Sequence, residues 1–519
     1  MKINILGGGP AGLFLSILMK EASPSDEITV MERDGPNDTF GWGIVFSAET
    51  FDFLEDVQPA VLSDIKSASE TWDNVVVGFG DETILVSGNR FSGIARLTFL
   101  NILHHHCRRL GVELKFHTNV TTPERIAELA DCDLLVGADG ANSLVRQTYS
   151  EFFCPSVDLR QNRYIWLGTN KVFDGLNMLF RENEAGLFIA HAYRFSKTTS
   201  TFIVECSPET WSRAGFSTMS DDETCAYLAA VWRKELDGQP LLSNNFVRWL
   251  NFPLIQNKRW SHKNIVLLGD ALHTAHFSIG SGTKLALEDA VAFAPLFREH
   301  RRVEDALSHF QRVRQPVVEK FQAAAYNSLT WLENVEAEMA LPAVPFAYRL
   351  MTRSQRVSYR RIQQGDPGFV RSYDRWRDEQ PPVGAIPAGF MDLFQKKSIG
   401  HLASLMADGK PHVTSVWVDY DGEYLLINSV KGRQKDLNME KRRHVAVEIN
   451  DPDNVNRFLA VRGEVVDVIE RGAGEHLDKL ALRYLNRDTY PQSMRYPGEV
   501  RRIYKIRLDH VFVWDPFGS

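Results

Sequence analysis

A run of glycines near the start of the chain, Gly7-Gly8-Gly9-Pro10-Ala11-Gly12, constrains the fold more than any other segment. The apolar run 3–6 precedes it and the apolar stretch 11–21 follows it, so the pattern predicts a strand, a sharp turn and a helix. Residues 28–32 then predict a second strand. Such a unit begins a parallel sheet, and its glycines and proline distinguish it from a signal peptide or a membrane span. We therefore expect no transmembrane segment and no targeting signal.

The same turn fits the GxGxxG pattern of dinucleotide-binding sites through Gly7, Gly9 and Gly12. The amides at the start of the following helix would face a pyrophosphate. Glu32 ends the second strand twenty residues after Gly12, where its carboxylate can accept hydrogen bonds from ribose hydroxyls, and Arg33 beside it is a further cofactor-binding candidate. The turn therefore predicts a dinucleotide, and it leaves FAD and NAD as alternatives.

The length and charge of the chain limit its class. A chain of 519 residues favours two or more domains, and 44% hydrophobic with 24% charged residues is typical of a globular protein. The net charge of −7, without a polybasic run, argues against nucleic acid as a partner. Five scattered cysteines without metal spacing favour a reducing compartment, so we expect a cytoplasmic enzyme of small molecules.

The remaining pattern divides the chain into segments. Short apolar runs at 133–137 and 264–268 predict further parallel strands, and residues 164–206, rich in aromatic and β-branched residues, predict an antiparallel sheet. A proline-rich and glycine-rich stretch at 379–387 is typical of a linker. Beyond it, short strands joined by Asp-Gly turns predict a small antiparallel barrel.

Two later turns, containing Asp139-Gly140 and Gly269-Asp270, resemble the DG and GD motifs of FAD-dependent aromatic hydroxylases of the single-component class. The resemblance implies that the dinucleotide is FAD and that Asp270 contacts its ribityl chain. It also places Arg96 and Asp139 in the cofactor site, and NAD(P)H would visit without a second glycine loop. Taken alone, Asp270 is as typical of a helix N-cap, although Gly280 and Gly282 nearby favour the cofactor role.

A closer resemblance is to the salicylyl-CoA and 2-aminobenzoyl-CoA hydroxylases, and more distantly to the hydroxylase of violacein assembly. It covers about residues 1–372 and is carried by segments 40–47, 186–193 and 276–283. The chain departs from the general hydroxylase pattern at Phe277, Ile279 and Lys284, where that pattern has Pro, Gly and Asn. The resemblance implies reduction of FAD by NAD(P)H, reaction with molecular oxygen and hydroxylation of an electron-rich aromatic ring. The substrate would be an aryl-CoA thioester or an aromatic amino acid derivative.

The substrate-side candidates are His191, Tyr193 and Trp42. His191 and Tyr193 alternate with apolar residues on a predicted strand that would line the pocket, although such residues are often only structural. Trp42 could stack on the substrate or fill the core. The histidines 104–106 point three ways around a helix, so we predict no metal site there.

Residues 388–519 resemble the split β-barrels related to pyridoxamine phosphate oxidase and to deazaflavin-dependent reductases. The resemblance implies that Ser429, Arg433 and Lys435 hold the phosphate of FMN or a deazaflavin. We also expect a homodimer through this barrel. On an extended segment, Arg433 and Lys435 would face the same side. Two alternatives stay open: a non-catalytic barrel used for packing or dimerisation, and a reductase of the hydroxylated product. The segments that carry this resemblance are 405–413, 416–417, 428–429, 432–435 and 462–463.

The sequence therefore predicts an α/β fold: a Rossmann-like FAD-binding domain with an antiparallel substrate-binding sheet, followed by an antiparallel split β-barrel. The monooxygenase would span 1–375, with the substrate sheet inserted near 155–260. A linker at 376–387 would lead to the barrel at 388–519. The expected partners are an aromatic substrate and molecular oxygen, with neither nucleic acid nor membrane.

Overall fold

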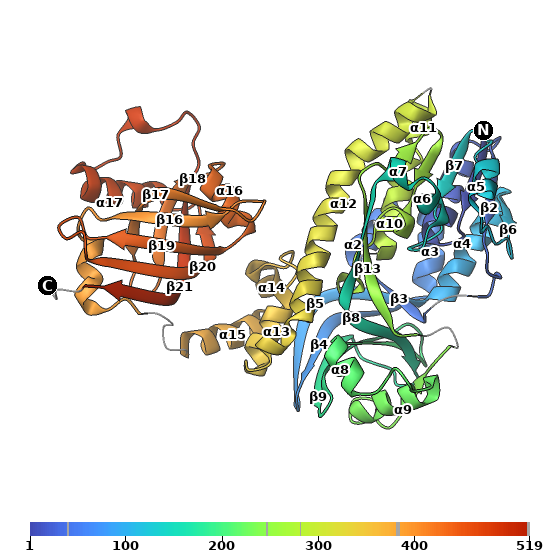
Figure 1. Cartoon of the computed structure of the whole chain (residues 1–519), viewed down its shortest axis with the longest axis horizontal. Coiled ribbons are helices and arrows are strands. Elements are labelled where there is room, and N and C mark those ends of the chain that lie inside the picture. Colours follow the sequence, from blue (N-terminus) through green and yellow to red (C-terminus); the bar gives the residue numbers. More distant parts are fainter. Residues whose placement is uncertain (39–40, 245–247, 281, 301, 380–384, 516–519) are drawn as a thin grey trace. The chain divides into compact units, whose positions relative to one another are not determined.

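The computed structural model describes residues 1–38, 41–244, 248–280, 282–300, 302–379 and 385–515. It divides into two compact units, Met1–Trp376 and Arg377–Ser519 (Figure 1). The predicted linker is helical at its start, because helix α15 (Pro367–Glu379) extends into it. The helix ends shortly before the first proline of the linker, at position 381. Residues 380–384 of that linker lie outside the described residues. None of the described helices is long and apolar enough to cross a membrane.

The first sheet of unit Met1–Trp376 is mostly parallel and has the order β14-β15-β7-β1-β2-β6. Its strands at 2–6, 27–31, 134–137 and 265–267 overlap the runs predicted as parallel strands, with ends that differ by one residue. Helices α4 (Arg96–Leu110) and α10 (Gly282–Phe293) each pack against α1 (Pro10–Ala22), and all three contribute to the apolar core around this sheet. The sheet strands are β1 (Lys2–Leu6), β2 (Glu27–Met31), β6 (Glu113–Lys115), β7 (Leu134–Gly137), β14 (Ser261–His262) and β15 (Ile265–Leu267).

The second sheet of this unit has the order β12-β8-β11-β10-β9-β4-β5-β3, with β13 also paired to β8. Three of its strands come from residues 43–95, outside the segment 155–260 in which the sequence predicts the sheet. They join it because β4 pairs in parallel with β9 over a large separation in sequence. The strands are β3 (Gly43–Ser47), β4 (Glu70–Phe79), β5 (Glu82–Ala95), β8 (Pro155–Thr169), β9 (Leu176–Asn183), β10 (Gly186–Arg194), β11 (Ser200–Cys206), β12 (Leu241–Leu242) and β13 (Leu250–Asn257).

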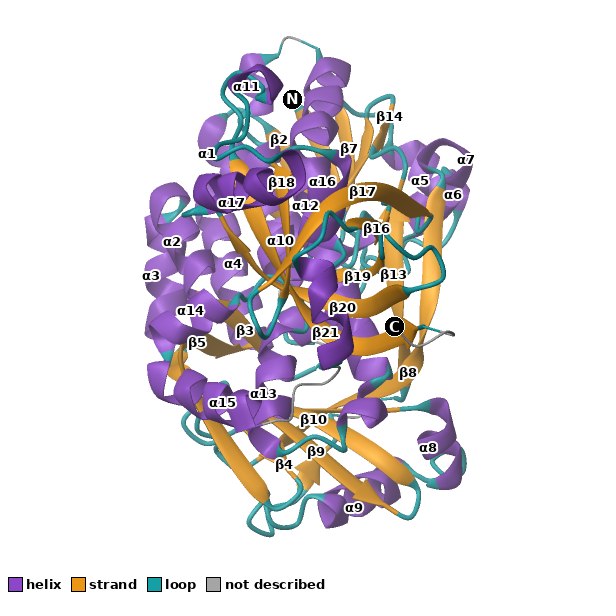
Figure 2. Cartoon of the chain, turned by 90° about the vertical axis from the view of Figure 1, so that its left-hand side faces the viewer, coloured by secondary structure: helices purple, strands orange, loops and turns teal. Residues whose placement is uncertain are grey.

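The two faces of the second sheet have different surroundings. Ala190 and Ala192 on β10 belong to the apolar cluster that contains Leu228 of helix α9 (Asp221–Val231), and Figure 2 shows α9 beside β9 and β10. Ile189 lies on the opposite face, in the cluster with Phe346 of helix α13 (Ala343–Thr352). His191 and Tyr193 share this second face with Ile189, because side chains two residues apart on a strand point the same way.

Further helices surround these sheets, and the longest, α12, contains Pro316 and contacts α10. They are α2 (Ala48–Val57), α3 (Pro59–Ser67), α5 (Pro123–Leu129), α6 (Leu144–Thr148), α7 (Ser150–Phe153), α8 (Pro208–Arg213), α11 (Leu296–Glu299), α12 (Val303–Glu333) and α14 (Tyr359–Gly365). Two short 3-10 turns, η1 (Gly269–Ala271) and η2 (Phe277–Ile279), connect β15 to α10.

Unit Arg377–Ser519 is a closed antiparallel barrel with the strand order β16-β17-β18-β21-β20-β19. Alternate residues of these strands, such as Leu402, Val418 and Ile427, fill its interior. The elements are β16 (Ile399–Leu405), β17 (Pro411–Tyr420), β18 (Leu425–Val430), β19 (His444–Asn450), β20 (Phe458–Ile469) and β21 (Arg501–Trp514), with helices α16 (Gln434–Lys441) and α17 (Ala473–Leu485). The predicted antiparallel barrel is therefore present.

Candidate functional site

The glycine turn between β1 and α1 is a close-packed corner with one open side. A Cβ atom on Gly7 would lie 2.2 Å from the Ala138 carbonyl oxygen, and one on Gly12 would lie 2.3 Å from the Gly7 carbonyl oxygen. By contrast, a Cβ on Gly9 would meet nothing within 4 Å, and Gly9 caps α1 without a side-chain hydrogen bond. No side chain therefore blocks the start of α1 at Gly9, and the unpaired first amides of a helix can bind an anion.

Glu32 lies at the end of β2, beside this turn. Its Oε2 accepts a hydrogen bond from the Gly8 amide at 2.7 Å, and its Oε1 accepts one from the Asp34 amide at 3.0 Å. The carboxylate thus holds the glycine turn against β2. Arg33 lies nearer the surface, with its side chain 56% exposed and its Nε donating to Asp34 at 3.2 Å.

Arg96 and Asp270, far apart in sequence, are close enough for their charges to interact. Burial lowers the pKa of Arg96, while the negative charges of Asp270 and Glu32 oppose that shift. The Nε of Arg96 is buried and has no hydrogen-bond partner in the described part of the chain. Asp270 has an exposed side chain, yet desolvation raises its pKa. An exposed carboxylate that is nevertheless desolvated lies in a hollow enclosed by protein.

Asp139 follows β7 and faces the start of α6. Its Oδ2 accepts hydrogen bonds from the amides of Leu144 at 2.7 Å and Val145 at 3.2 Å. Its Oδ1 is buried without a partner among the residues described, and burial raises the pKa of the carboxyl group. Oδ2 of this carboxylate therefore binds the start of α6, and Oδ1 is free to accept a hydrogen bond from a ligand.

The segment between η1 and α10 carries the last two predicted glycines. Gly280 adopts φ +60°, a left-handed conformation that favours glycine, and a Cβ there would lie 3.3 Å from Val45 of β3. Gly282 begins α10, with nothing within 4 Å of its Cβ position. Ser281 between them lies outside the described residues, as does Phe40 of the first resembling segment.

The predicted substrate-side residues have definite partners. His191 Nε2 lies 2.9 Å from Glu205 Oε1, and the Tyr193 hydroxyl donates to the Gly43 carbonyl at 2.8 Å. Trp42 packs against β8, where a Cβ on Gly168 would lie 2.5 Å from its ring. The structure thus brings His191 and Tyr193 to one face of the sheet.

Sequence reasoning does not identify Tyr164 and Glu205, although both lie on this face. The Tyr164 ring lies 5.0 Å from Phe277 of η2, and His191 lies 5.3 Å from the same Phe277 ring. Burial, together with the negative charge of Asp270, raises the pKa of Tyr164 to about 12. Tyr164 therefore connects the sheet face with the hollow around Asp270. The only signal in sequence is a lone acid, Glu205, at the end of an apolar strand.

In the barrel, Ser429, Arg433 and Lys435 gather near one end of β18. Lys435 lies within α16 and Arg433 caps it, so the expectation of an extended segment is wrong: the helix begins at Gln434. Lys435 is only 9% exposed, and burial, with the charges of Arg433 and Arg501, lowers its pKa. The Ser429 hydroxyl is buried and unbonded within the described residues. This is a cluster of positive charge with an unused hydroxyl, which suits an anion.

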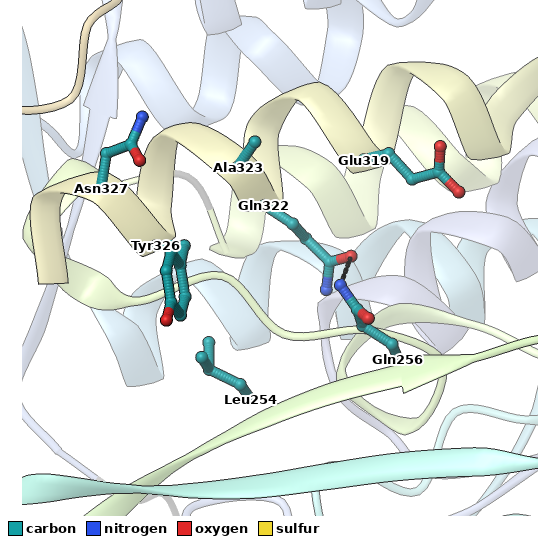
Figure 3. Close-up of a pocket in the computed structure, with 7 residues that line it drawn as sticks. All are labelled: Leu254, Gln256, Glu319, Gln322, Ala323, Tyr326 and Asn327. Carbon is teal, nitrogen blue, oxygen red and sulfur yellow. Dashed lines mark hydrogen bonds between the residues drawn. The ribbon is translucent and has the colours of Figure 1, made fainter. Parts of the chain in front are cut away.

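A groove of about 250 Å³ lies between β13 and α12 (Figure 3). Gln256 donates to Gln322 across it at 3.2 Å, and Gln322 also donates to the carbonyls of Ile255 and Thr274. The predicted site residues do not line it. Its lining residues are Leu254, Gln256, Glu319, Gln322, Ala323, Tyr326 and Asn327.

Comparison with known proteins gives consistent matches. A family model described as an FAD binding domain matches residues 1–325. Salicyloyl-CoA 5-hydroxylase from a Streptomyces species is 36% identical over 445 residues, covering 81% of this chain and 85% of the relative. The 3-hydroxy-4-methyl-anthranilyl-(aryl-carrier protein) 5-monooxygenase of Streptosporangium sibiricum is 34% identical, covering 71% of this chain and 99% of the relative.

Among solved structures, the tetrameric form of 2-methyl-3-hydroxypyridine-5-carboxylic acid oxygenase aligns with a TM-score of 0.55. It covers 69% of this chain and 98% of that protein at 18% identity, so this likeness concerns the fold alone.

Proposed function

The chain belongs to the FAD binding domain family and is an FAD-dependent aromatic monooxygenase; from this premise we propose that it hydroxylates an aryl group carried as a thioester. The supporting observation is that two relatives, aligned over most of this chain, are named for aryl groups carried on coenzyme A and on a carrier protein. Both names include a polar substituent on the ring, which matches the polar side chains of His191 and Tyr193 on this sheet face.

The FAD site we propose uses the residues around the hollow. The start of α1, with Gly7, Gly9 and Gly12, would hold the pyrophosphate, and Glu32 would bind a ribose. Arg96 and Asp270 fit a polar cofactor, since one has an unpaired buried nitrogen and the other an open but desolvated carboxylate. The remaining members of the proposed site are Arg33, Asp139, Gly280 and Gly282.

When bound, FAD would supply the redox chemistry: a nicotinamide provides the electrons, and molecular oxygen provides the oxygen atom that is added to the ring. The protein's own task is to hold the ring and exclude water. In our proposal His191 and Tyr193 bind the ring substituents, and Trp42 supports β8 beside them. We propose NADH or NADPH as the reductant.

For the second unit we propose a flavin or deazaflavin site within residues 388–519, joined by a connection at 376–387 to a monooxygenase unit at 1–375. Ser429, Arg433 and Lys435 would hold the cofactor phosphate, with Arg501 adding charge to the cluster. The barrel also presents the exposed aromatic side chains of Phe512 and Trp514 on β21, which supports a homodimer through this unit.

The purified full chain tests the proposed substrate class. Salicyloyl-CoA and 2-aminobenzoyl-CoA are compared with free salicylate and 2-aminobenzoate, each with NADH or NADPH and isotopically labelled oxygen. We expect mass spectrometry to find one labelled oxygen atom in a thioester product and none in the free acids. Labelled product from a free acid at an equal or greater rate would contradict the proposal.

A further inference from the structure

We infer that Glu205 is a positioning residue that orients His191 to accept a proton from a hydroxyl group on the substrate ring. This inference rests on the proposed function, since it names how that substrate is activated. Glu205 lies at the end of β11 and His191 on the neighbouring β10, and both side chains point to the face that carries Tyr193. The pairing places a carboxylate behind an imidazole.

The hydrogen bond between the pair defines which imidazole nitrogen is available. A carboxylate only accepts, so the His191 Nε2, 2.9 Å from Glu205 Oε1, carries the hydrogen. The lone pair then lies on Nδ1, and within the described part of the chain the ring's hydrogen bond is the one from Nε2. The His191 side chain is 5% exposed and that of Glu205 is 1% exposed, so the imidazole is the more accessible member.

The surroundings keep Glu205 ionised although it is buried. Burial alone raises the pKa of Glu205, but the hydrogen bond to His191 and the positive charge of Arg353 lower it overall. Arg353 is itself held in place, donating to the Ser328 hydroxyl at 2.8 Å and to the Ser278 carbonyl at 2.7 Å. His276, which precedes η2, lies near the pair. Other charged or titratable groups near the pair and His276 are Arg160 and Tyr164 from β8 and Arg353 after α13.

The pair lies beside the turn that follows Asp270. The His191 ring is 5.3 Å from Phe277, and Phe277 is also 5.0 Å from Tyr164, whose pKa responds to Asp270. A substrate ring held near the proposed cofactor residues would therefore also lie near His191. Tyr193 is a poorer proton acceptor, because its hydroxyl already donates to Gly43 and burial raises its pKa.

The proposed step moves one proton and needs no oxidant. The O–H bond of the ring hydroxyl breaks, its electron pair stays on oxygen, and the proton forms an N–H bond at His191 Nδ1. The imidazolium that results is stabilised by the adjacent Glu205 carboxylate. The phenolate donates more electron density to the ring than the phenol does, so the ring becomes a better acceptor of an electrophilic oxygen atom.

The test follows the absorbance of bound salicyloyl-CoA as a function of pH in the full-length protein. We expect the phenolate band to appear at least about one pH unit lower when the ligand is bound than when it is free. Glu205→Gln and His191→Gln should return that midpoint toward the free value, with bound FAD and melting temperature measured to confirm folding. Glu182→Gln, the same change at an exposed position on β9, should behave as the unmodified protein.

The possible failures have different meanings. If salicyloyl-CoA binds the unmodified protein with the midpoint of the free ligand, the inference is overturned while the proposed substrate class stands. The same holds if both variants, folded and loaded with FAD, keep the lowered midpoint. If salicyloyl-CoA does not bind the unmodified protein, the proposed substrate class fails and the inference fails with it.

Discussion

Charged side chains in the first unit are tied together across several elements. Asp289 of α10 accepts from Arg314 of α12 at 2.7 Å, and its other oxygen lies 2.7 Å from His273, three residues after Asp270. The turn that carries Asp270 is thus anchored to two helices. The sequence identifies Asp270 and Arg96 by motif and resemblance. It does not identify Glu205, because pairing His191 with Glu205 depends on the register between β10 and β11.

Loss of the Asp270 carboxylate should weaken FAD binding. An acceptor in a desolvated hollow makes strong hydrogen bonds, so Asp270→Ala should raise the Kd for FAD by about ten- to a hundred-fold, equivalent to about 1.5–3 kcal/mol. The measurement is fluorescence titration of FAD into the apoprotein. Asp222→Ala, an exposed carboxylate at the start of α9, serves as the control. An unchanged Kd in the Asp270 variant would remove this residue from the proposed site.

Stability should depend on pH through His104. Burial, with the charge of Arg108, lowers the pKa of His104 to about 4, against about 6.5 in the unfolded chain. Between these values the unfolded chain binds more protons, so this contribution to stability is full above pH 6.5 and is lost as the pH falls toward 4. The melting temperature of a His104→Gln variant should therefore fall less between pH 7 and 5 than that of the unmodified protein. His105→Gln, at the exposed neighbouring position, should fall as much as the unmodified protein.

At the scale of elements, the sequence predicts strands that are marked by a local apolar pattern. The strands at 2–6, 134–137 and 265–267 are apolar runs between turn residues, and the pattern finds them. The strands β3 to β5 are not assigned to the second sheet, because they join it by the non-local pairing of β4 with β9. The extended segment expected at Arg433 and Lys435 is instead the start of helix α16, which packs against β16. This helix is too short to show a helical periodicity in the sequence.

The start of α1 offers a matched pair of glycine variants. Gly9 has a φ of −81°, and a Cβ there would have no described atom within 4 Å beyond its chain neighbours, so Gly9→Ala should keep the fold and melting behaviour of the protein without FAD. If the pyrophosphate lies in that space, the added methyl should still weaken FAD binding. Gly12→Ala, with its Cβ 2.3 Å from a carbonyl oxygen, should destabilise the protein itself. Full FAD affinity in folded Gly9→Ala would contradict the placement of the pyrophosphate.

At the scale of the whole molecule, the two units have separate cores. The apolar residues of the barrel form one cluster from Ile386 to Leu508, which contains no residue of unit Met1–Trp376 among those described. The alignment with salicyloyl-CoA 5-hydroxylase covers 81% of the chain, more than that first unit provides, so the similarity extends into the second. The length of the chain and its proline-rich stretch predict two domains, because a long chain forms separate cores and a short proline-rich segment can connect them.

The last prediction concerns what the barrel binds when it is separated. Because its core is self-contained, a fragment of residues 377–519 should fold on its own and give a cooperative melting transition. Lys435 is buried beside two other cations, so a phosphate should bind there and offset their repulsion. Titration with FMN, FAD and a deazaflavin should therefore show binding of at least one, and Arg433→Ala with Lys435→Ala should abolish it without unfolding the fragment. Lys431→Ala, at a position 53% exposed, should leave the affinity unchanged. A folded fragment that binds none of the three would leave the barrel as a packing or dimerisation module, because the cation cluster would then have no phosphate to hold.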